Sequence, residues 1–360
     1  MNPTKIIHDL GQSIWLDNIT RDLLNSGTLQ RYIDEFSVTG LTSNPTIFDH
    51  AIRDSTDYDN DISQGAARAK SREDLFFSLA VADLARAADL FRPIHDRTDG
   101  VDGWVSLEVS PSLAYDTEAS LAAARDLHQR AGKPNLFIKI PGTAEGLPAI
   151  EAAIFAGIPI NVTLLFSREQ YVAAAEAYLR GVERRIEAGL NPAVASVASL
   201  FVSRWDVAVA GKVPAELNNR LGIAIAQRTY NAYDELLASE RFRRAANSGG
   251  RAQRLLWAST GTKDPKASDI LYVKALAAPF TVNTIPDGTL RAFADHGEVD
   301  EMLRPDGGEC EKSLAAFAKA GVDAGVLADR LQKEGADSFV KSWNDLMECI
   351  ASKSKALKAA

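Results

Sequence analysis

The sequence predicts an α/β protein, a closed TIM-type barrel of eight parallel β-strands surrounded by α-helices. Two observations lead to this prediction. Short apolar runs alternate with longer amphipathic segments, which is typical of a parallel sheet covered by helices. Eight such runs fit into one chain of 360 residues, and this favours a closed barrel over an open doubly wound sheet.

The expected strands are short runs rich in β-branched, aliphatic and aromatic residues, bounded by Gly, Pro or polar residues. In chain order they lie at 13–19, 38–45, 103–110, 135–141, 158–166, 193–202, 254–262 and within 272–283. Asp116 or Thr117 and Ser167 are expected to cap two of the helices, and Gly132 to end one. The expected helices are 1–12 (a helix or an arm), 20–35, 72–91, 116–131, 145–156, 167–188, 214–245, 309–320 and 323–352.

No linker divides the chain, so a single barrel domain is expected over residues 1–350. Residues 351–360 are rich in Lys and Ala and are expected to form a tail or the start of a linker. The pattern assigns no oligomeric state.

Composition and charge argue against several functional classes for this protein. The formal net charge of -8 argues against a general binder of nucleic acids or anionic membranes, but it leaves room for a local basic pocket. No apolar stretch reaches membrane-spanning length, and neither common nucleotide-binding fingerprint is present. The two cysteines, Cys310 and Cys349, lack metal-ligand spacing and indicate a protein of the reducing cytoplasm.

One strand carries a lysine in an unusual setting. Leu136, Ile138 and Ile140 alternate with Phe137 and Lys139, so the lysine lies on the face opposite the aliphatic side chains. If that face lies inside the barrel, the lysine loses hydration, which favours the neutral amine that attacks a carbonyl. The alternative is an edge-strand lysine that limits sheet pairing, and for a lysine considered alone it is the stronger interpretation.

Other residues favour a lysine inside the barrel over an edge-strand lysine. They collect at the C-terminal ends of successive strands, where barrel enzymes carry their chemistry. Taken singly, each has a structural explanation: Asp17 as a helix cap, Asn44 as the start of a turn, Thr163 as a common strand residue. Their joint placement is harder to explain that way. The set is Asp17, Asn44, Glu108, Lys139, Asn161, Thr163, Ser199, Phe201, Arg204, Ser259 and Lys263.

The histidines indicate no metal site. His8, His50, His95, His128 and His296 are scattered along the chain, and none has a partner at metal-ligand spacing. No metal is therefore expected.

Five segments together resemble the successive signatures of transaldolases: GLTSNPTIF (40–48), LEVSPSLAYDTEAS (107–120), LFIKIPGT (136–143), INVTLLFS (160–167) and SLFVSRWD (199–206). The resemblance implies a barrel of the class I aldolase type with extra helices, and no metal or organic cofactor. It implies transfer of a dihydroxyacetone unit between a ketose phosphate (fructose 6-phosphate, sedoheptulose 7-phosphate) and an aldose phosphate (erythrose 4-phosphate, glyceraldehyde 3-phosphate). This reaction belongs to the non-oxidative pentose phosphate pathway.

The resemblance also implies residue roles. Lys139 forms a Schiff base with the ketose carbonyl, and Asp17 exchanges a proton with the C4 hydroxyl. Glu108 moves protons through a water held with Thr163. The residues expected to bind the substrate are Asn44, Asn161, Ser199, Phe201, Arg204, Ser259 and Lys263, with Arg204 on the phosphate.

The chain departs from the family pattern after its seventh strand. Many transaldolases have Ala-Ser-Phe-Arg there, with an arginine that supports the phosphate. This chain continues from Ala258-Ser259 to Lys263, so Lys263 is the candidate replacement. The longer segments at 46–100 and 205–250 resemble a bacterial subgroup in which some members are fused to a phosphoglucose isomerase, so a fused or associated isomerase is a possible partner.

Two alternatives stay open. A free fructose 6-phosphate aldolase is disfavoured because those shorter chains have glutamine at the position of Glu108. A non-catalytic barrel that binds sugar phosphates is disfavoured by Asp17, Glu108 and Lys139 together, since a binder gains nothing from a buried amine.

Overall fold

The structure is a closed barrel of eight parallel strands that follow one another around the barrel in chain order. It is a computed structural model and describes residues 2–66, 68–299 and 301–359. The strands are β1 (Ser13–Leu16), β2 (Val38–Thr42), β3 (Trp104–Glu108), β4 (Leu136–Pro141), β5 (Ile160–Leu165), β6 (Ser196–Phe201), β7 (Gln253–Ala258) and β8 (Val282–Ile285). Because β8 also pairs with β1, the sheet has no edge, and the predicted fold class is confirmed.

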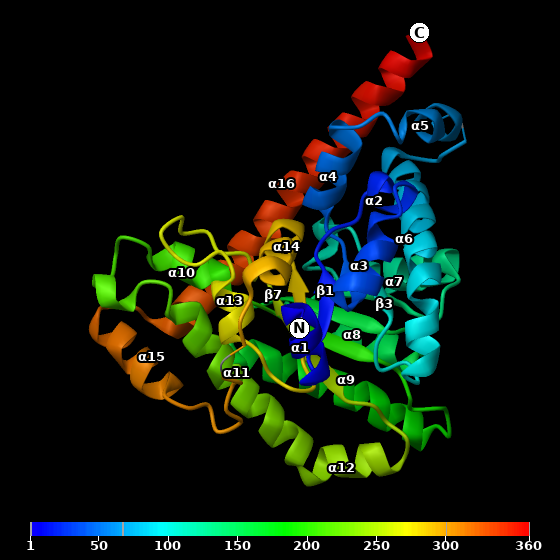
Figure 1. Ribbon diagram of the computed structural model, residues 1–360. Helices are drawn as coiled ribbons and strands as arrows, with labels where there is room; N and C mark the ends of the chain where they lie inside the picture. Colours follow the sequence, from blue (N-terminus) through cyan, green and yellow to red (C-terminus); the bar gives the residue numbers. More distant parts are fainter. Residues whose placement is uncertain (1, 67, 300, 360) are drawn as a thin grey trace.

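Helices surround the barrel (Figure 1). They are α1 (Pro3–Asp9), α2 (Arg21–Asn25), α3 (Thr28–Phe36), α4 (Pro45–Arg53), α5 (Asp59–Gly65), α6 (Arg72–Arg97), α7 (Thr117–Ala131), α8 (Gly146–Phe155), α9 (Arg168–Glu187), α10 (Ser203–Val209), α11 (Leu221–Ala238), α12 (Glu240–Asn247), α13 (Leu271–Ala275), α14 (Asp287–His296), α15 (Cys310–Lys319) and α16 (Ala324–Ala359), with 3₁₀ turns at Pro111–Leu113 and Ala215–Leu217. The long α16 packs against α4, α5, α6 and β5, and its C-terminal end projects beyond α5 in the view of Figure 1.

The predicted caps are confirmed. The side chain of Asp116 accepts a hydrogen bond from the backbone of Ala119 at the start of α7. Ser167 does the same for Gln170 at the start of α9. Gly132 ends α7 in the left-handed conformation, which glycine adopts without steric cost.

Two predicted helices are each divided in the structure. The segment 20–35 forms α2 and α3, with Gly27 between them at φ 74. The segment 214–245 contains α11 and α12, because Ser239 leaves the helical conformation and caps α12 by accepting from the backbone of Phe242. Local capping chemistry overrides the continuous apolar periodicity in this second case.

Other boundaries also differ from the prediction. The segment 272–283 is largely helix and loop, and β8 starts only at its end. The seventh strand stops at Ala258, since Ser259 adopts φ 57. Residues 351–359, predicted as a tail, continue α16, and the division into a domain over residues 1–350 and a tail stays a prediction. The short helices α4, α5, α10, α13 and α14 were not predicted.

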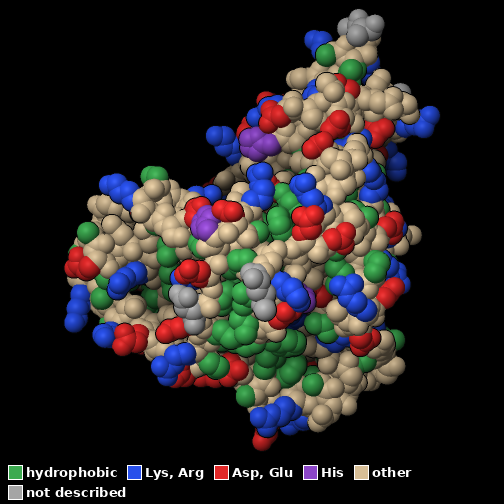
Figure 2. Space-filling model, viewed as in Figure 1, with side chains coloured by type: hydrophobic (Ala, Val, Ile, Leu, Met, Phe, Trp, Pro, Cys, Tyr) green, Lys and Arg blue, Asp and Glu red, His purple; other side chains and the backbone are tan. Residues whose placement is uncertain are grey.

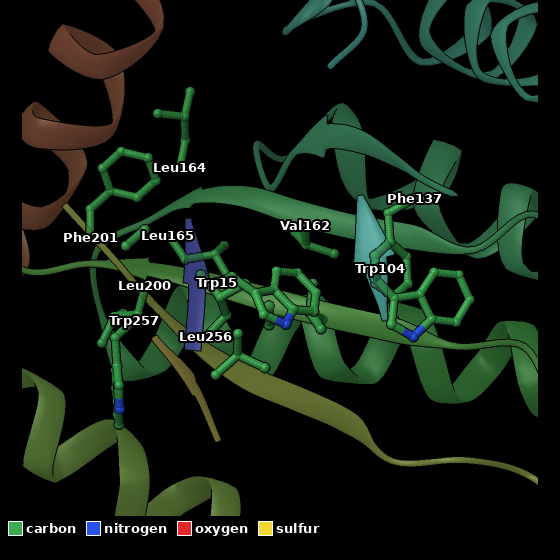
Figure 3. Close-up of a cluster of buried hydrophobic side chains, with 14 of the residues drawn as sticks. Trp15, Trp104, Phe137, Val162, Leu164, Leu165, Leu200, Phe201, Leu256 and Trp257 are labelled. Atoms are coloured by element: carbon green, nitrogen blue, oxygen red, sulfur yellow. The ribbon is translucent and has the colours of Figure 1, made fainter. Parts of the chain in front are cut away.

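The N-terminal half of the barrel interior is filled by side chains. At its base Asp102 accepts hydrogen bonds from the Ser13 hydroxyl and from Trp15 Nε1. Above it the ring of Phe137 stacks on Trp104 with centroids 4.1 Å apart and lies 6.1 Å from the Trp15 ring (Figure 3). These three aromatic rings form an apolar floor beneath the C-terminal half of the barrel interior.

The outer surface carries mixed charge. On the face shown in Figure 2, Lys and Arg side chains are interspersed with Asp and Glu side chains. Within the described ranges, none of the helices has the length and apolar character needed to span a bilayer.

Close packing of the floor generates a stability prediction. A Cβ at Gly40 would lie 2.5 Å from the backbone oxygen of Trp104 and 2.8 Å from the Trp15 ring. We therefore expect Gly40→Ala to lower the free energy of unfolding by about 1–3 kcal/mol through overpacking, as measured by denaturant titration. The control is Gly288→Ala in α14, where none of the described residues has an atom within 4 Å of the added Cβ and a gain of about 0.4–1 kcal/mol is expected. Equal stability of the two variants would contradict this account.

Candidate active site

A cavity of about 210 Å³ opens at the C-terminal ends of the strands. Strand ends, the loops that follow them, and the helices α4, α10 and α16 all contribute to its wall. Its lining residues are Asp17, Thr42, Asn44, Thr46, Ile47, Lys139, Ser199, Phe201, Arg204, Ala258, Ser259, Gly261, Lys263, Thr284, Pro286 and Phe339. The cavity lies where a β/α barrel carries its chemistry.

Lys139 lies at the bottom of this cavity, on β4. Its Nζ is 3.1 Å from Glu108 Oε2 and donates a hydrogen bond to the Ser43 carbonyl oxygen at 3.2 Å. Both members of the Lys139–Glu108 ion pair are almost fully buried. The pair follows from strand register, because Glu108 on β3 lies directly opposite Lys139 and both side chains point into the barrel.

Two carboxyl groups beside the amine have shifted proton affinity. Burial raises the pKa of Glu108 above its ordinary value, although the positive charge of Lys139 opposes the shift. Burial likewise raises the pKa of Asp17, opposed by the charge of Lys139, by the Thr42 hydroxyl and by the charge of Lys263. A carboxylate with a raised pKa is a stronger base, so both groups are suited to accept a proton from a neighbouring group.

Asp17 is held by groups from two neighbouring strands. Its backbone N–H donates to the Ile285 carbonyl at 2.8 Å. The Thr42 hydroxyl donates to Asp17 Oδ1 at 2.8 Å and lies 2.6 Å from the Thr284 hydroxyl. Because Thr42 uses its proton on Asp17, Thr284 is the donor in the second bond. These hydrogen bonds, from Thr284 to Thr42 and from Thr42 to Asp17, orient the carboxylate towards the cavity.

Arg204 brings positive charge to the wall of the cavity. It follows β6 on α10, and its guanidinium carbon lies 5.1 Å from the Phe201 ring centre and 5.7 Å from that of Phe339. Among the described residues no hydrogen bond or ion pair joins this guanidinium to a carboxylate. Burial lowers the pKa of Arg204, but an arginine stays charged. A half-buried guanidinium without a paired anion, with Lys263 on the same cavity, is suited to bind an anionic ligand.

The amide and hydroxyl groups of the site form short hydrogen-bonded units. Asn161 Nδ2 donates to the Ser106 hydroxyl at 3.1 Å, and the Ser199 hydroxyl donates to Asn161 Oδ1 at 2.7 Å. Asn44 caps α4 with its Oδ1, which accepts from the Ile47 backbone at 3.0 Å. The cap leaves Asn44 Nδ2 as the atom that can donate to a ligand. The Ser259 hydroxyl pairs with that of Ser203 at 2.9 Å.

Two buried oxygens on the strands beside the lysine have no hydrogen-bond partner among the described residues. They are Glu108 Oε1 and Thr163 Oγ1, on the two strands that flank β4. A buried oxygen without a partner is costly, so a polar ligand or a water is the expected neighbour of each. After Thr163 the strand is irregular, with Leu164 at φ 59.

The structure brings together most of the residues predicted from the sequence. Eight of the eleven line the cavity. Glu108, Asn161 and Thr163 do not line it; Glu108 contacts Lys139, Asn161 contacts Ser199, and no hydrogen bond connects Thr163 with Glu108. In the described part of the chain no group of three or more His, Cys, Asp or Glu residues could hold a metal ion. The roles assigned to the site residues, and the absence of a metal or cofactor, stay predictions.

Several residues of the site were missed. Thr42 and Ser43 lie inside the GLTSNPTIF segment and contact Asp17 and Lys139, so their position next to Asn44 was a usable signal. Thr284 was missed because β8 was placed too early. Phe339 had no signal in the sequence, since nothing in the apolar pattern of α16 says that one of its residues reaches the barrel mouth.

Comparison with known proteins gives a consistent result. The family described as Transaldolase/Fructose-6-phosphate aldolase matches residues 14–350. A protein named Transaldolase from Saccharopolyspora erythraea is 44% identical, over 96% of this chain and 95% of its own length. A Transaldolase from Thermobifida fusca is also 44% identical, over 97% and 98%. Transaldolase 2 from Nostoc punctiforme is 40% identical, over 98% and 97%.

Proposed function

Because the chain belongs to the transaldolase/fructose-6-phosphate aldolase family, we propose that it is a transaldolase whose Schiff-base nucleophile is Lys139. It is an enzyme of the transferase class, and it moves a dihydroxyacetone unit from a ketose phosphate to an aldose phosphate. The family membership confirms the resemblance seen in the five sequence segments. The observation that supports the residue assignment best is the buried contact of 3.1 Å between Lys139 Nζ and Glu108.

Imine formation starts with proton transfer inside this pair. Glu108 takes a proton from Lys139, which neutralises both groups, and the raised pKa of the Glu108 carboxyl favours this direction. The neutral amine then attacks the C2 carbonyl of the ketose. The carbinolamine loses its hydroxyl as water, with Glu108 as the proton donor. The unpartnered oxygens of Glu108 and Thr163 support the predicted water between them.

Cleavage of the C3–C4 bond needs a base on the C4 hydroxyl. Asp17 takes this proton, and the electron pair of the broken bond enters the enamine on Lys139. The aldose phosphate then leaves and another enters. Asp17 returns the proton as the enamine attacks the new aldehyde, and hydrolysis of the imine releases the new ketose phosphate.

The remaining residues hold the substrate. Asn44, Asn161 and Ser199 are placed to bind the hydroxyls of the dihydroxyacetone unit, which must stay in position while the aldose is exchanged. Arg204 binds the phosphate, because its planar group matches an oxyanion. Lys263 takes the place of the second arginine common in the family, which its position on the same cavity supports.

Two further parts of the proposal concern the cellular setting. The first is a cytoplasmic location. It is supported by Cys310 and Cys349, which are free cysteines, because the cytoplasm keeps thiols reduced. A fused or associated phosphoglucose isomerase is tested by assaying that activity in the protein purified from its native source; its absence there contradicts this part.

A coupled assay tests the proposed function. With fructose 6-phosphate and erythrose 4-phosphate we expect glyceraldehyde 3-phosphate and sedoheptulose 7-phosphate to form. Asp17→Asn is expected to lower kcat by about 10²–10⁴-fold, and Lys139→Met to remove activity, since no other amine replaces the nucleophile. The control is Lys341→Met, an exposed lysine on α16. Unchanged activity in Lys139→Met contradicts the assignment.

The Lys263 assignment makes a separate prediction about KM. A charge-assisted hydrogen bond is worth about 1.5–3 kcal/mol, so Lys263→Met is expected to raise the KM of fructose 6-phosphate by about 10- to 100-fold. The KM of unphosphorylated fructose should not change. Lys266→Met, in the same loop but away from the cavity, is the matched control. Equal effects on both sugars would show that Lys263 does not bind the phosphate.

The pH dependence tests the role of Asp17. Only the ionised carboxylate accepts a proton, so activity falls as Asp17 is protonated, and its raised pKa places this fall above the ordinary aspartate range near 3.9. The Thr42 hydroxyl stabilises the carboxylate and lowers this pKa, so Thr42→Val should move the acid limb of kcat to higher pH. Thr46→Val, which removes a hydroxyl bonded to Ser342 instead, should leave the limb in place. A limb that moves to lower pH in Thr42→Val excludes Asp17 as the base.

A further inference from the structure

Phe339 is the residue of the cavity wall that comes from the C-terminal helix α16. Its ring centre lies 6.0 Å from Lys139 Nζ and 5.7 Å from the Arg204 guanidinium carbon. The ring of Phe201 lies 6.5 Å away at an interplanar angle of 63°. Phe339 is 5% exposed. A buried apolar ring thus lies close to two of the cationic groups of the cavity, Lys139 and Arg204.

The position of this ring is fixed by contacts of α16 with the strand ends. Gln332 Nε2 donates to the carbonyl oxygens of Gly142 and Leu164, at 3.1 and 2.9 Å, just after β4 and near the end of β5. One turn later, a Cβ on Gly335 would lie 3.1 Å from Arg204 Nη1 and 3.0 Å from Leu164 Cδ2. Glycine at position 335 therefore leaves room for Arg204 and Leu164 beside the helix, and the same helix places the Phe339 ring 6.0 Å from Lys139 Nζ.

The chemistry of the ring restricts what it can do there. A phenyl group neither donates nor accepts an ordinary hydrogen bond, so it contributes little to recognition of sugar hydroxyls. It does remove water from the space above the amine. Water matters most after C3–C4 cleavage, when the enamine on Lys139 has lost one aldose phosphate and has not yet received another.

We propose that Phe339 is a specificity-determining residue that shields the enamine on Lys139 from water and so favours transfer over release of free dihydroxyacetone. The inference rests on the proposed transaldolase function. In the competing path, C3 of the enamine takes a proton, and the electron pair of its double bond forms the new C–H bond, which leaves an iminium. One water molecule then adds to C2, and dihydroxyacetone leaves as the amine is restored. This water equals the one lost in imine formation, so fructose 6-phosphate yields only dihydroxyacetone and glyceraldehyde 3-phosphate.

A purely structural role for Phe339 makes a different prediction. Trp343, one turn further along α16, packs against Phe76 and Phe77 of α6 with ring centres 5.1 and 5.6 Å away, and it does not line the cavity. If Phe339 only helps to attach α16, then weakening the attachment through Trp343 should have the same effect on the reaction.

The test measures the partition of the enamine in the full chain. Fructose 6-phosphate and erythrose 4-phosphate are supplied, and free dihydroxyacetone and sedoheptulose 7-phosphate are quantified in the same reaction. In Phe339→Leu and Phe339→Ala we expect the ratio of dihydroxyacetone to sedoheptulose 7-phosphate to rise by about tenfold as water reaches the enamine. In Trp343→Leu the ratio should stay at its original value. The leucine variant retains most of the apolar volume, so it provides the test if the alanine variant does not fold.

The outcomes separate the inference from the proposed function. Absence of sedoheptulose 7-phosphate with the unaltered chain overturns both. Normal transfer by the unaltered chain, with an unchanged ratio in a folded Phe339→Leu, overturns the shielding role alone. A ratio that rises equally in Trp343→Leu assigns the effect to attachment of α16 and also overturns it. A rise confined to the Phe339 variants supports the inference.

Discussion

The site depends on an ion pair buried inside a closed barrel. Removing Lys139 and Glu108 from water costs free energy that their mutual attraction recovers only in part, so such a pair is weak evidence for a role in stability. The role proposed for the pair is proton exchange. At a separation of 3.1 Å a single proton transfer converts a charged pair into a neutral one, and burial favours the neutral state of Glu108.

The rest of the structure keeps this pair in place and largely buried. The aromatic floor of Trp15, Trp104 and Phe137 closes the barrel below it, and strand register sets Glu108 opposite Lys139. Hydroxyls from β2 and β8 orient Asp17 at the wall. Helix α16 covers the C-terminal side of the pair, where Gln332 donates hydrogen bonds to the carbonyl oxygens of Gly142 and Leu164. A barrel whose strands meet without an edge provides the rigid frame that these distances require.

Features of the site that depend on neighbouring residues in the sequence could be predicted, whereas features that depend on contacts between distant segments could not. The alternation of Phe137 and Lys139 with aliphatic residues placed the lysine on the face opposite the aliphatic side chains, because strand periodicity is a local property. Polar residues at strand ends identified half of the residues in the cavity wall for the same reason. The breaks at Gly27 and Ser239 and the late start of β8 were missed, since amphipathic periodicity does not reveal where one helix stops and another begins. Phe339 was beyond prediction, because its place depends on how a helix nearly two hundred residues after Lys139 crosses the barrel.

The central claim is that Lys139 carries the dihydroxyacetone unit as a Schiff base, and trapping this intermediate tests it most directly. The protein is reduced with borohydride in the presence of fructose 6-phosphate, digested and analysed by mass spectrometry. We expect a dihydroxyacetone adduct on the peptide that contains Lys139, and its loss when erythrose 4-phosphate is added before the reductant. An adduct that persists with the acceptor would indicate a free aldolase. The absence of any adduct on Lys139 in the folded protein would contradict the Schiff-base mechanism.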